Sequence, residues 1–316
     1  MRVVFFGTPD FAVATLHAIC HSEHEIVGVV TAQDKPAGRG LKIQGSEVKQ
    51  YAVDHGIPIL QPVKLKDADF IKMLIQWNAD IFVVVAFRFL PYEVYSIPPR
   101  GTFNVHASLL PQYRGAAPIH WAIMNGETRT GITTFFLTNE IDSGDIILQK
   151  EIDILPTETT GEVYTRLKYL GAEAALTTLS LIAQNGCKPM SQNQMEAKKI
   201  KSAPKIHPKD TLINWNSTAK DIFNKIRGLA PHPGALTFFT NENKKKFSVK
   251  IFKAAIIYEK NKEKAGKIIT DDKTFFNITT KDFQISVHNL QIEGKKRLDI
   301  IPFLQGNKIS NYIIIA

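Results

Sequence analysis

The sequence predicts an α/β protein: a Rossmann-like, doubly wound and mostly parallel sheet, followed by a smaller β-rich, barrel-like (OB-like) C-terminal domain. Apolar runs alternate with helical patterns in the first part, a polar stretch follows at residues 184–207, and short β-rich runs fill the remainder. At roughly 150 residues per domain, the 316 residues suit two domains. We therefore expect a first domain at 1–185, a linker at 186–206 and a basic β-barrel domain at 207–316.

The first expected strands are short apolar runs rich in β-branched residues, as strands buried on both faces require: residues 3–6, 26–30 and 81–86. Helical patterns separate them, at residues 10–21, 46–55 and 68–77. Thr8 is placed to cap the first helix, and Pro9 suits its first turn. The βαβα order predicts parallel strands with crossover helices.

Three more strands are expected before the linker, at residues 103–108, 131–137 and 146–150. A helix is expected at 160–183, where Thr159 and Glu162 have the spacing of a capping box. After the linker, a helix is expected near 217–229. Short runs separated by turns then predict a small antiparallel barrel or sandwich: 235–240, 247–254, 266–269, 274–279, 284–287 and 298–303.

The positive charge of the chain is concentrated in its last third. Residues 201–316 hold 21 Lys and Arg against 10 Asp and Glu, a net charge of +11, whereas residues 1–200 have a net charge of −2. Two interpretations explain this excess equally well. One is a lysine-rich solvated surface, and the other is a surface that binds a polyanion, most often nucleic acid. Charge alone leaves both interpretations open.

Several classes of protein are disfavoured. No apolar run approaches the ~18 residues of a membrane span, and the first residues lack a signal-peptide core. Two cysteines, Cys20 and Cys187, exclude a disulfide scaffold and a cysteine-based zinc cluster, and they favour a reducing cytosol.

Two motifs that suggest cofactors are incomplete. Pro9 stands where a dinucleotide-binding fingerprint has its second glycine, so a nicotinamide enzyme is not expected. His17 and His21 share a helix face, with His24 just beyond, but Ala18 replaces the glutamate that a zinc-protease motif needs. Histidines near a helix C-terminus are the simpler interpretation.

The most informative segment is 101–115, GTFNVHASLLPQYRG. On the strand expected there, Asn104, His106 and Ser108 share one face. Such a polar trio is costly unless it lines a cavity or is fully hydrogen-bonded, and ligands bind beyond the carboxyl ends of strands in these sheets. Asn104 supplies an amide donor for an oxyanion, and His106 supplies a group that moves protons at neutral pH.

A carboxylate is expected to orient the imidazole of His106. Asp142 and Asp145 are the candidates, and they lie in a loop between two expected strands. The same Asp-Ser-Gly-Asp residues have the chemistry of a plain hairpin turn. On the sequence alone, a turn is the simpler interpretation of this loop.

A second loop, residues 34–42, is irregular because of its proline and glycines, and basic in a part of the chain that is net negative. Its cations are Lys35, Arg39 and Lys42. The loop is either a solvated surface segment or a mobile arm that clasps an anionic substrate.

The chain resembles the 10-formyltetrahydrofolate-dependent formyltransferases. The shared marks are Asn104-Val-His106, Ser108-Leu-Leu-Pro111 and Asp142-x-Gly-Asp145. The similarity runs essentially end to end. It is close to the members that act on charged initiator tRNA, through FGTPDFA at 6–12, KPAGRG at 35–40, SLLPQYRGAAPIHWAI at 108–123, GET at 126–128 and IRGLAPHPGA at 226–235.

This resemblance implies transfer of a formyl group from 10-formyltetrahydrofolate to the α-amino group of methionyl initiator tRNA, for translation initiation. It also implies that the domain at 1–185 is the catalytic domain and that the domain at 207–316 binds tRNA. By position, the catalytic trio is Asn104, His106 and Asp142. The segment matching the folate contacts is Ser108, Leu109, Leu110 and Pro111, and the residues matching the pterin pocket are Val85, Phe87, Arg88 and Leu90. The residues matching the tRNA-binding loop are Lys35, Arg39 and Lys42.

One position departs from the resemblance, because Arg88 stands where many members have glycine. The folate is implied as a co-substrate, with no metal and no NAD. The implied partner is initiator methionyl-tRNA, without a membrane, and a cytoplasmic monomer is expected.

Three alternatives remain. One is a formyltransferase for a purine precursor or an amino sugar, although such small substrates need no basic extension of 116 residues. Another is a hydrolase that passes the formyl group to water. The third is a nucleic-acid-binding protein with an inactive first domain, which the intact trio disfavours.

Overall fold

The computed structural model describes residues 1–316 except 38–41, 195–199, 242, 261–262 and 316. The chain forms two compact units, and each unit is built from three separate segments of the sequence. Unit 1 consists of Met1–Pro118, Arg129–Ile152 and Tyr164–Ser202. Unit 2 consists of Ile119–Thr128, Asp153–Val163 and Ala203–Ala316.

Unit 1 is built on one sheet with the strand order β5-β2-β1-β6-β7-β8-β9. Its strands are β1 (Arg2–Gly7), β2 (Glu25–Val30), β5 (Ile59–Leu60), β6 (Ile81–Val85), β7 (Thr102–His106), β8 (Arg129–Phe136) and β9 (Ile146–Asp153). The pairs from β5 to β7 are parallel, and β8 runs antiparallel to β7. The expected parallel strands form because their apolar residues are covered on both faces.

The helices within residues 1–202 are α1 (Asp10–Cys20), α2 (Glu47–Asp54), α3 (Ala68–Gln76), α4 (Tyr92–Tyr95), α5 (Pro118–Met124), α6 (Thr160–Ala183) and the 3-10 helix η1 (Gln192–Gln194). Of these, α5 from Ile119 and the first four residues of α6 belong to unit 2. The side chains of Ser46 and Asp67 cap α2 and α3 by accepting backbone N–H bonds. At α1 the N-cap position is Pro9, without a side-chain cap, so the expected cap by Thr8 is wrong by one residue.

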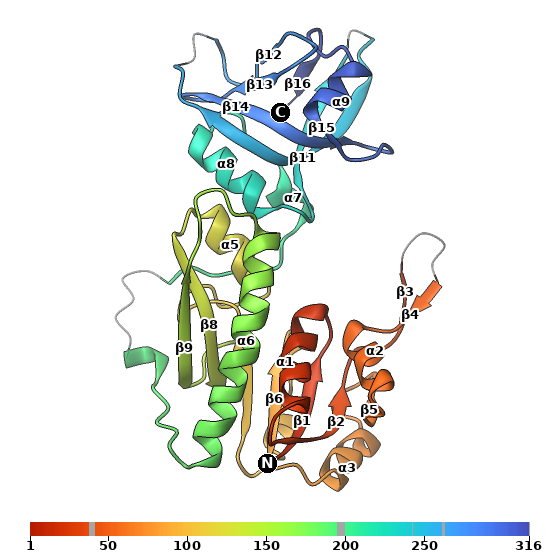
Figure 1. Cartoon of the computed structure of the whole chain (residues 1–316), viewed down its shortest axis with the longest axis vertical. Helices are drawn as coiled ribbons and strands as arrows, with labels where there is room; N and C mark the ends of the chain where they lie inside the picture. Colours follow the sequence, from red (N-terminus) through yellow and green to blue (C-terminus); the bar gives the residue numbers. More distant parts are fainter. Residues whose placement is uncertain (38–41, 195–199, 242, 261–262, 316) are drawn as a thin grey trace. The chain divides into compact units, whose positions relative to one another are not determined.

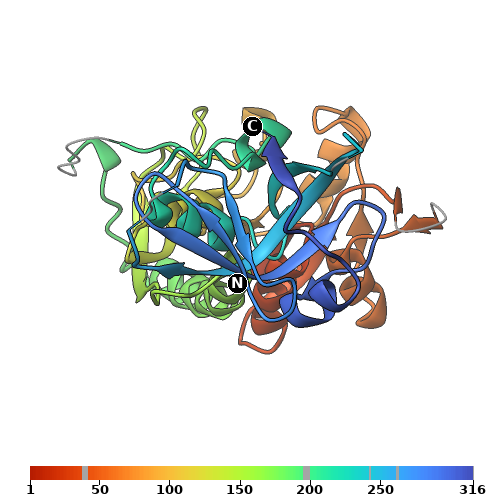
Figure 2. The ribbon, with the colours of Figure 1, turned by 90° about the horizontal axis from the view of Figure 1, so that it is seen from above.

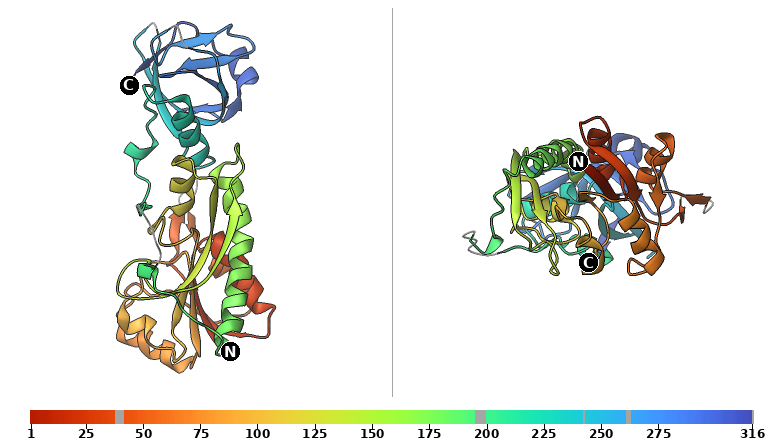
Figure 3. Two further views of the ribbon diagram at one scale, coloured as in Figure 1. Left: turned by 90° about the vertical axis from the view of Figure 1, so that its left-hand side faces the viewer. Right: turned by 90° about the horizontal axis from the view of Figure 1, so that it is seen from below.

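Helices cover both faces of this sheet. On one face Leu74 of α3 packs in a cluster with Phe6 of β1 and Phe82 of β6. On the other face α6 lies along β8 and β9 (Figure 1; Figure 3, left panel). Thr178 of α6 shares a hydrogen bond of 2.7 Å with Thr134 of β8. The sheet thus presents its strand ends, and not its faces, to a ligand.

Unit 2 contains an antiparallel sheet in the order β12-β13-β14-β11-β10-β16, with β15 paired to β14. Its elements are α7 (Pro208–Thr211), α8 (Ala219–Gly228), β10 (Ala235–Thr240), β11 (Lys246–Ile257), β12 (Ile268–Thr270), β13 (Phe276–Thr279), β14 (Gln284–Ile292), β15 (Leu298–Asp299), α9 (Ile300–Gln305) and β16 (Ile313–Ile315). The strands fan out and curl into a nearly closed barrel (Figure 2). Apolar side chains of α8 and of the strands, including Ile226, Phe239 and Phe276, fill its interior.

The predicted fold class is confirmed, with one wrong element and one that is more ordered than expected. Residues 298–303 were expected to be a strand, but β15 ends at Asp299 and α9 follows. The segment 186–206 was expected to be a plain linker, yet Gln192 and Ala203 in it are buried. The predicted domain boundaries and roles remain predictions.

Candidate active site

The predicted pair Asn104 and His106 lies on β7, toward its C-terminal end, where the parallel part of the sheet meets the antiparallel strand β8. His106 is the last residue of the strand and is buried, with 6% of its surface exposed. Asn104 lies on the same face two residues earlier, about 7 Å away at the usual rise per residue. In the described part of the chain nothing hydrogen-bonds the side-chain amide of Asn104, which is half-buried.

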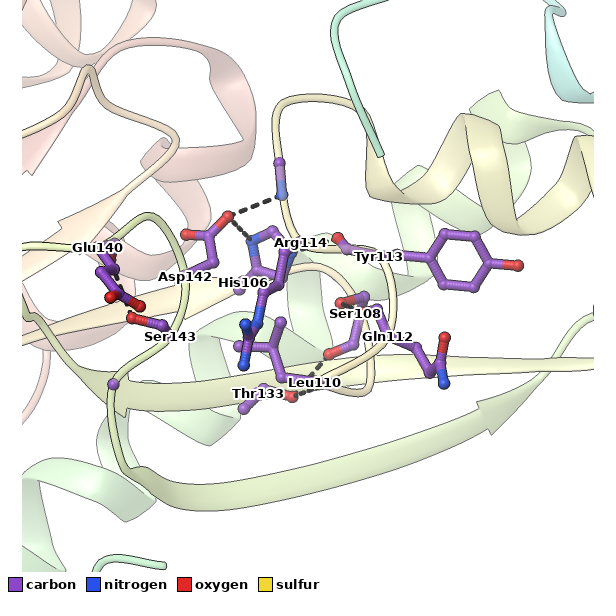
Figure 4. A network of polar contacts seen from close by, with 12 residues as sticks. His106, Ser108, Leu110, Gln112, Tyr113, Arg114, Thr133, Glu140, Asp142 and Ser143 are labelled. Atoms are coloured by element: carbon purple, nitrogen blue, oxygen red, sulfur yellow. Dashed lines mark hydrogen bonds and ion pairs between the residues drawn. The ribbon is translucent and has the colours of Figure 1, made fainter. Parts of the chain in front are cut away.

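The two ring nitrogens of His106 have different surroundings (Figure 4). Nε2 donates to the backbone carbonyl of Tyr113 over 2.9 Å, because a carbonyl oxygen can only accept. Nδ1 lies 3.8 Å from Oδ2 of Asp142, which is beyond hydrogen-bond distance. Nδ1 therefore makes no hydrogen bond with any residue that the structure describes, and it faces the carboxylate of Asp142.

Asp142 is held in a strained position that aims its carboxylate at the histidine. Its backbone has φ +51°, in the left-handed region, and its Oδ2 accepts the N–H of Gly115 over 2.8 Å. Tyr113, whose carbonyl binds His106, also has a positive φ, +62°. Two strained non-glycine residues on one imidazole point to a functional site. The other candidate, Asp145, is exposed, and its backbone carbonyl pairs with Phe136.

Ser108 lies outside the strand, contrary to the expected polar trio on one strand face. The strand ends at His106, and the Ser108 hydroxyl donates to the carbonyl of Gln112 over 2.7 Å, inside a turn. Thr133 of β8 then fixes this turn by donating to the Ser108 carbonyl and accepting the N–H of Leu110. The serine thus shapes the loop that carries Tyr113.

Several of the predicted folate residues are buried in this structure. Ser108, Leu110, Val85 and Leu90 are at most 2% exposed. Pro111 is also buried, whereas Leu109 and Phe87 are half-buried.

The guanidinium of Arg88 is engaged with a neighbouring loop. It donates to the carbonyls of Pro62 and Val63, over 2.5 and 3.0 Å, and it lies over the ring of Phe87. The arginine at this unusual position therefore turns its charge toward the 62–63 loop.

The predicted tRNA-binding loop begins and ends as a hairpin of β3 (Lys35–Ala37) and β4 (Lys42–Gln44). Lys35 is exposed. Arg39 lies outside the described residues, and of Lys42 only the backbone is described. At the base of the hairpin Asp34 accepts bonds from Gln61 and Lys49, which lower its pKa.

The histidines of α1 have a structural explanation. His21 is the C-cap of α1, and its Nδ1 donates to the carbonyl of His17 over 2.8 Å. His55 caps α2 in the same way, through the carbonyl of Tyr51. Within the described ranges, no group of three or more His, Cys, Asp or Glu side chains is arranged to hold a metal ion.

Three contributors to the site were missed by sequence reasoning. Tyr113 and Gly115 act through backbone atoms, which no side-chain pattern reveals. Gln192 contacts both site loops from a segment without any periodicity.

A cavity of about 570 Å³ in unit 2, near Asp272 and Lys308, contains none of the predicted site residues.

The fold and the site define a class. A family described as formyl transferase matches residues 1–179, and its C-terminal domain family matches residues 205–308. A solved sugar 3N-formyltransferase, WlaRD, crystallised in the presence of dTDP and 5-N-formyl-THF, has a similar fold. Its TM-score is 0.65 at 22% identity, over 94% of this chain and 99% of that one.

Two curated relatives are both methionyl-tRNA formyltransferases. The protein from Bacteroides thetaiotaomicron is 45% identical over 98% of this chain and 97% of its own. The protein from Azobacteroides pseudotrichonymphae is 48% identical over 97% of this chain and 96% of its own. This chain belongs to the formyl transferase family, and within it to the methionyl-tRNA formyltransferases. Of the helices that the structure describes, none has the length and apolar character that crossing a membrane requires.

Proposed function

We propose that this chain transfers the formyl group of 10-formyltetrahydrofolate to the α-amino group of methionyl initiator tRNA, the step that prepares this tRNA for translation initiation. The observation that carries the proposal is the pair of His106, at the end of β7, and Asp142, with Nδ1 and Oδ2 3.8 Å apart. Near this pair lies the side-chain amide of Asn104, which no described residue hydrogen-bonds. Family membership supports the proposed substrates, and the geometry of the site supports the chemical roles proposed for its residues.

The proposed reaction needs an oxyanion donor and a proton carrier. The amine nitrogen attacks the formyl carbon, a C–N bond forms, and the carbonyl electrons move to oxygen. Asn104 donates to that oxyanion. The bond to N10 then breaks, and a proton from the attacking amine passes to N10. His106 carries this proton through Nδ1, and Asp142 balances the charge on the ring.

For the folate, we propose contacts with two segments at the strand ends. One holds Ser108, Leu109, Leu110 and Pro111, and the other holds Val85, Phe87, Arg88 and Leu90. The half-buried ring of Phe87 is the side chain available for stacking on the pterin.

For the tRNA, we propose that Lys35, Arg39 and Lys42 meet the acceptor stem and that the net charge of +11 in residues 201–316 attracts the phosphate backbone. The enzyme is proposed to act as a monomer in the cytosol, where initiator tRNA is charged. Its two cysteines are unpaired, as a reducing compartment requires.

One assay tests the function against its alternatives. The purified chain is given 10-formyltetrahydrofolate with charged initiator tRNA, with an amino-sugar nucleotide, with a purine-precursor amine, or with buffer alone. Formyl incorporation is followed by mass spectrometry, and release of tetrahydrofolate by absorbance. We expect formyl incorporation only in the reaction with charged initiator tRNA, where the product is formyl-methionine on the tRNA. Release without incorporation would indicate a hydrolase, and formylation of a small amine would replace the tRNA as substrate.

A further inference from the structure

Gln192 is a buried polar side chain in a segment whose sequence indicates only a linker. It lies in η1, and 3% of its surface is exposed. Its exposed neighbour Gln194 is in the same short helix. Burying an amide costs free energy unless its donors and acceptors are paired. The partners of Gln192 therefore indicate what its burial achieves.

Both ends of the Gln192 amide are paired. Oε1 accepts from the guanidinium of Arg114, over 3.1 Å from Nε and 2.6 Å from Nη2. Nε2 donates to the carbonyls of Asp142 and Gly144, over 3.0 and 2.8 Å. Both amide hydrogens and the carbonyl oxygen are thus in use.

These partners lie in the two loops that build the candidate site. Arg114 stands between Tyr113, whose carbonyl binds His106, and Gly115, whose N–H binds the Asp142 carboxylate. Figure 4 shows Arg114 in the loop beside this pair. Gln192 therefore joins the loop that holds the imidazole to the loop that carries the carboxylate.

The carboxylate loop needs such support. A residue at φ +51° is unfavourable for an aspartate and persists only where its surroundings hold it. Gln192 bonds the carbonyl of this residue and the carbonyl two residues later. Without these bonds the loop can relax, and the carboxylate moves away from Nδ1.

We propose that Gln192 is a positioning residue for formyl transfer, which fixes the backbone of Asp142 so that its carboxylate stays beside His106. This inference rests on the proposed function of the pair. Gln192 touches no reacting atom and acts only through Asp142.

Two variants separate the functions of the amide. Gln192→Glu keeps an acceptor for Arg114 but removes the donors to Asp142 and Gly144. Gln192→Met keeps the shape and removes all the bonds. Gln194→Glu and Gln194→Met are matched controls, because this exposed residue lies in the same helix.

The test measures kcat, KM for both substrates, the pH profile of kcat and the melting temperature of the full chain. We expect both Gln192 variants to lower kcat by about 10- to 100-fold, as misplacement of a catalytic group by about 1 Å does. We expect the pH at which kcat reaches half of its maximum to change, because the Asp142 carboxylate no longer lies in its place beside His106. Folate binding and both Gln194 variants should stay near wild type.

A double-mutant cycle with Asp142→Asn decides the mechanism. If Gln192 acts only through this carboxylate, Gln192→Met adds little to the loss caused by Asp142→Asn. Additive losses, or a kcat and pH profile unchanged in both Gln192 variants, would overturn the inference. If Gln192→Met fails to fold, the milder Gln192→Glu carries the cycle. A wild-type chain that formylates no tRNA, or an Asp142→Asn variant with full activity, would instead refute the proposed function.

Discussion

At the scale of single residues, the site combines side chains that sequence motifs reveal with backbone atoms that they do not. Asn104 and His106 could be predicted because two polar side chains on one face of a buried strand are costly unless they line a cavity or are hydrogen-bonded. Asp142 could not be distinguished from an ordinary turn residue, because the sequence Asp-Ser-Gly-Asp is also typical of hairpin turns. Its positive φ and its position near Nδ1 appear only in the folded chain.

The carboxylate of Asp142 gives the first prediction. Asp142→Asn suits the left-handed backbone, because asparagine tolerates that region, and it keeps an oxygen for the N–H of Gly115. We expect kcat to fall by about 100-fold or more, with folding and folate affinity unchanged, because the charge that balances His106 is lost. Single-turnover kinetics measure this loss. Asp145→Asn, in the same loop, serves as the control and should remain active.

Arg39 gives a prediction from the sequence alone, since it lies outside the described residues. We expect Arg39→Ala to reduce formylation of methionyl-tRNA strongly while folate affinity stays the same. Arg39→Lys should rescue part of the activity, because lysine cannot form bidentate contacts. Steady-state kinetics with both substrates check this, with the exposed Lys72→Ala on α3 as the control. Equal losses toward tRNA and folate would mean that the arginine supports the folate pocket instead.

At the scale of elements, most helices and strands follow from apolar periodicity, but α9 does not. The run at 298–303 is apolar and rich in isoleucine, so propensity indicates a strand, whereas the chain turns into a helix after Asp299. Tertiary packing overrides local preference here, because Phe303 and Leu304 are buried in the interior of unit 2. The expected capping box at α6 is present, since Glu162 accepts the Thr159 N–H over 2.7 Å.

The loop after β8 depends on a close approach at Gly144. A Cβ at this position would lie 1.7 Å from the carbonyl oxygen of Phe136, so the loop would have to move. We expect Gly144→Ala to lower stability by about 1–3 kcal/mol, typical of overpacking, and to reduce kcat further by displacing Asp142. Urea unfolding and kcat measure both effects. Gly186→Ala, where a Cβ meets only an ordinary contact of 3.7 Å, should behave like wild type.

In unit 2 the turn between β12 and β13 depends on an ionised Asp272. A hydrogen bond from the Ser310 hydroxyl lowers the pKa of Asp272 from its ordinary 3.8, and the N–H groups of Ile309 and Ser310 lower it further against the effect of burial. The unfolded chain therefore takes up this proton first as the pH falls. The stabilisation is present above about pH 4 and is lost as the pH drops through the lower folded pKa.

We accordingly expect Asp272→Asn to be less stable than wild type at pH 7, with a difference that shrinks as the pH falls below 4. Urea unfolding at pH 7, 5 and 3 measures this. Glu259→Gln removes an exposed carboxylate from the same unit and serves as the control. A difference that stays constant across the pH range would show that the charge of Asp272 contributes nothing.

At the scale of the whole molecule, the two units are not two consecutive stretches of the chain. Segments 119–128 and 153–163 belong to unit 2, although they lie inside the range predicted as the catalytic domain. The buried guanidinium of Arg227 donates to the carbonyl of Glu158 over 3.1 Å, and Thr160 donates to the carbonyl of Gly228 over 2.7 Å. A fragment of residues 1–200 would lose these two hydrogen bonds, so tRNA binding is best tested on the intact chain.

The uneven charge of the chain gives the last prediction. Residues 201–316 carry a net +11, and residues 1–200 carry −2. If the basic part binds the phosphate backbone, each neutralised phosphate releases counterions, and the logarithm of the affinity falls linearly with the logarithm of the salt concentration, by roughly 0.7–0.9 per contact. We expect the binding of charged initiator tRNA to weaken steeply between about 50 and 200 mM salt, by tenfold or more for several contacts. Filter binding measures this, with the binding of 5-formyltetrahydrofolate to the same preparation as the control, which should change little. A tRNA affinity as insensitive to salt as the folate affinity would mean that the lysine-rich surface is only solvated and that recognition of the tRNA rests on other contacts.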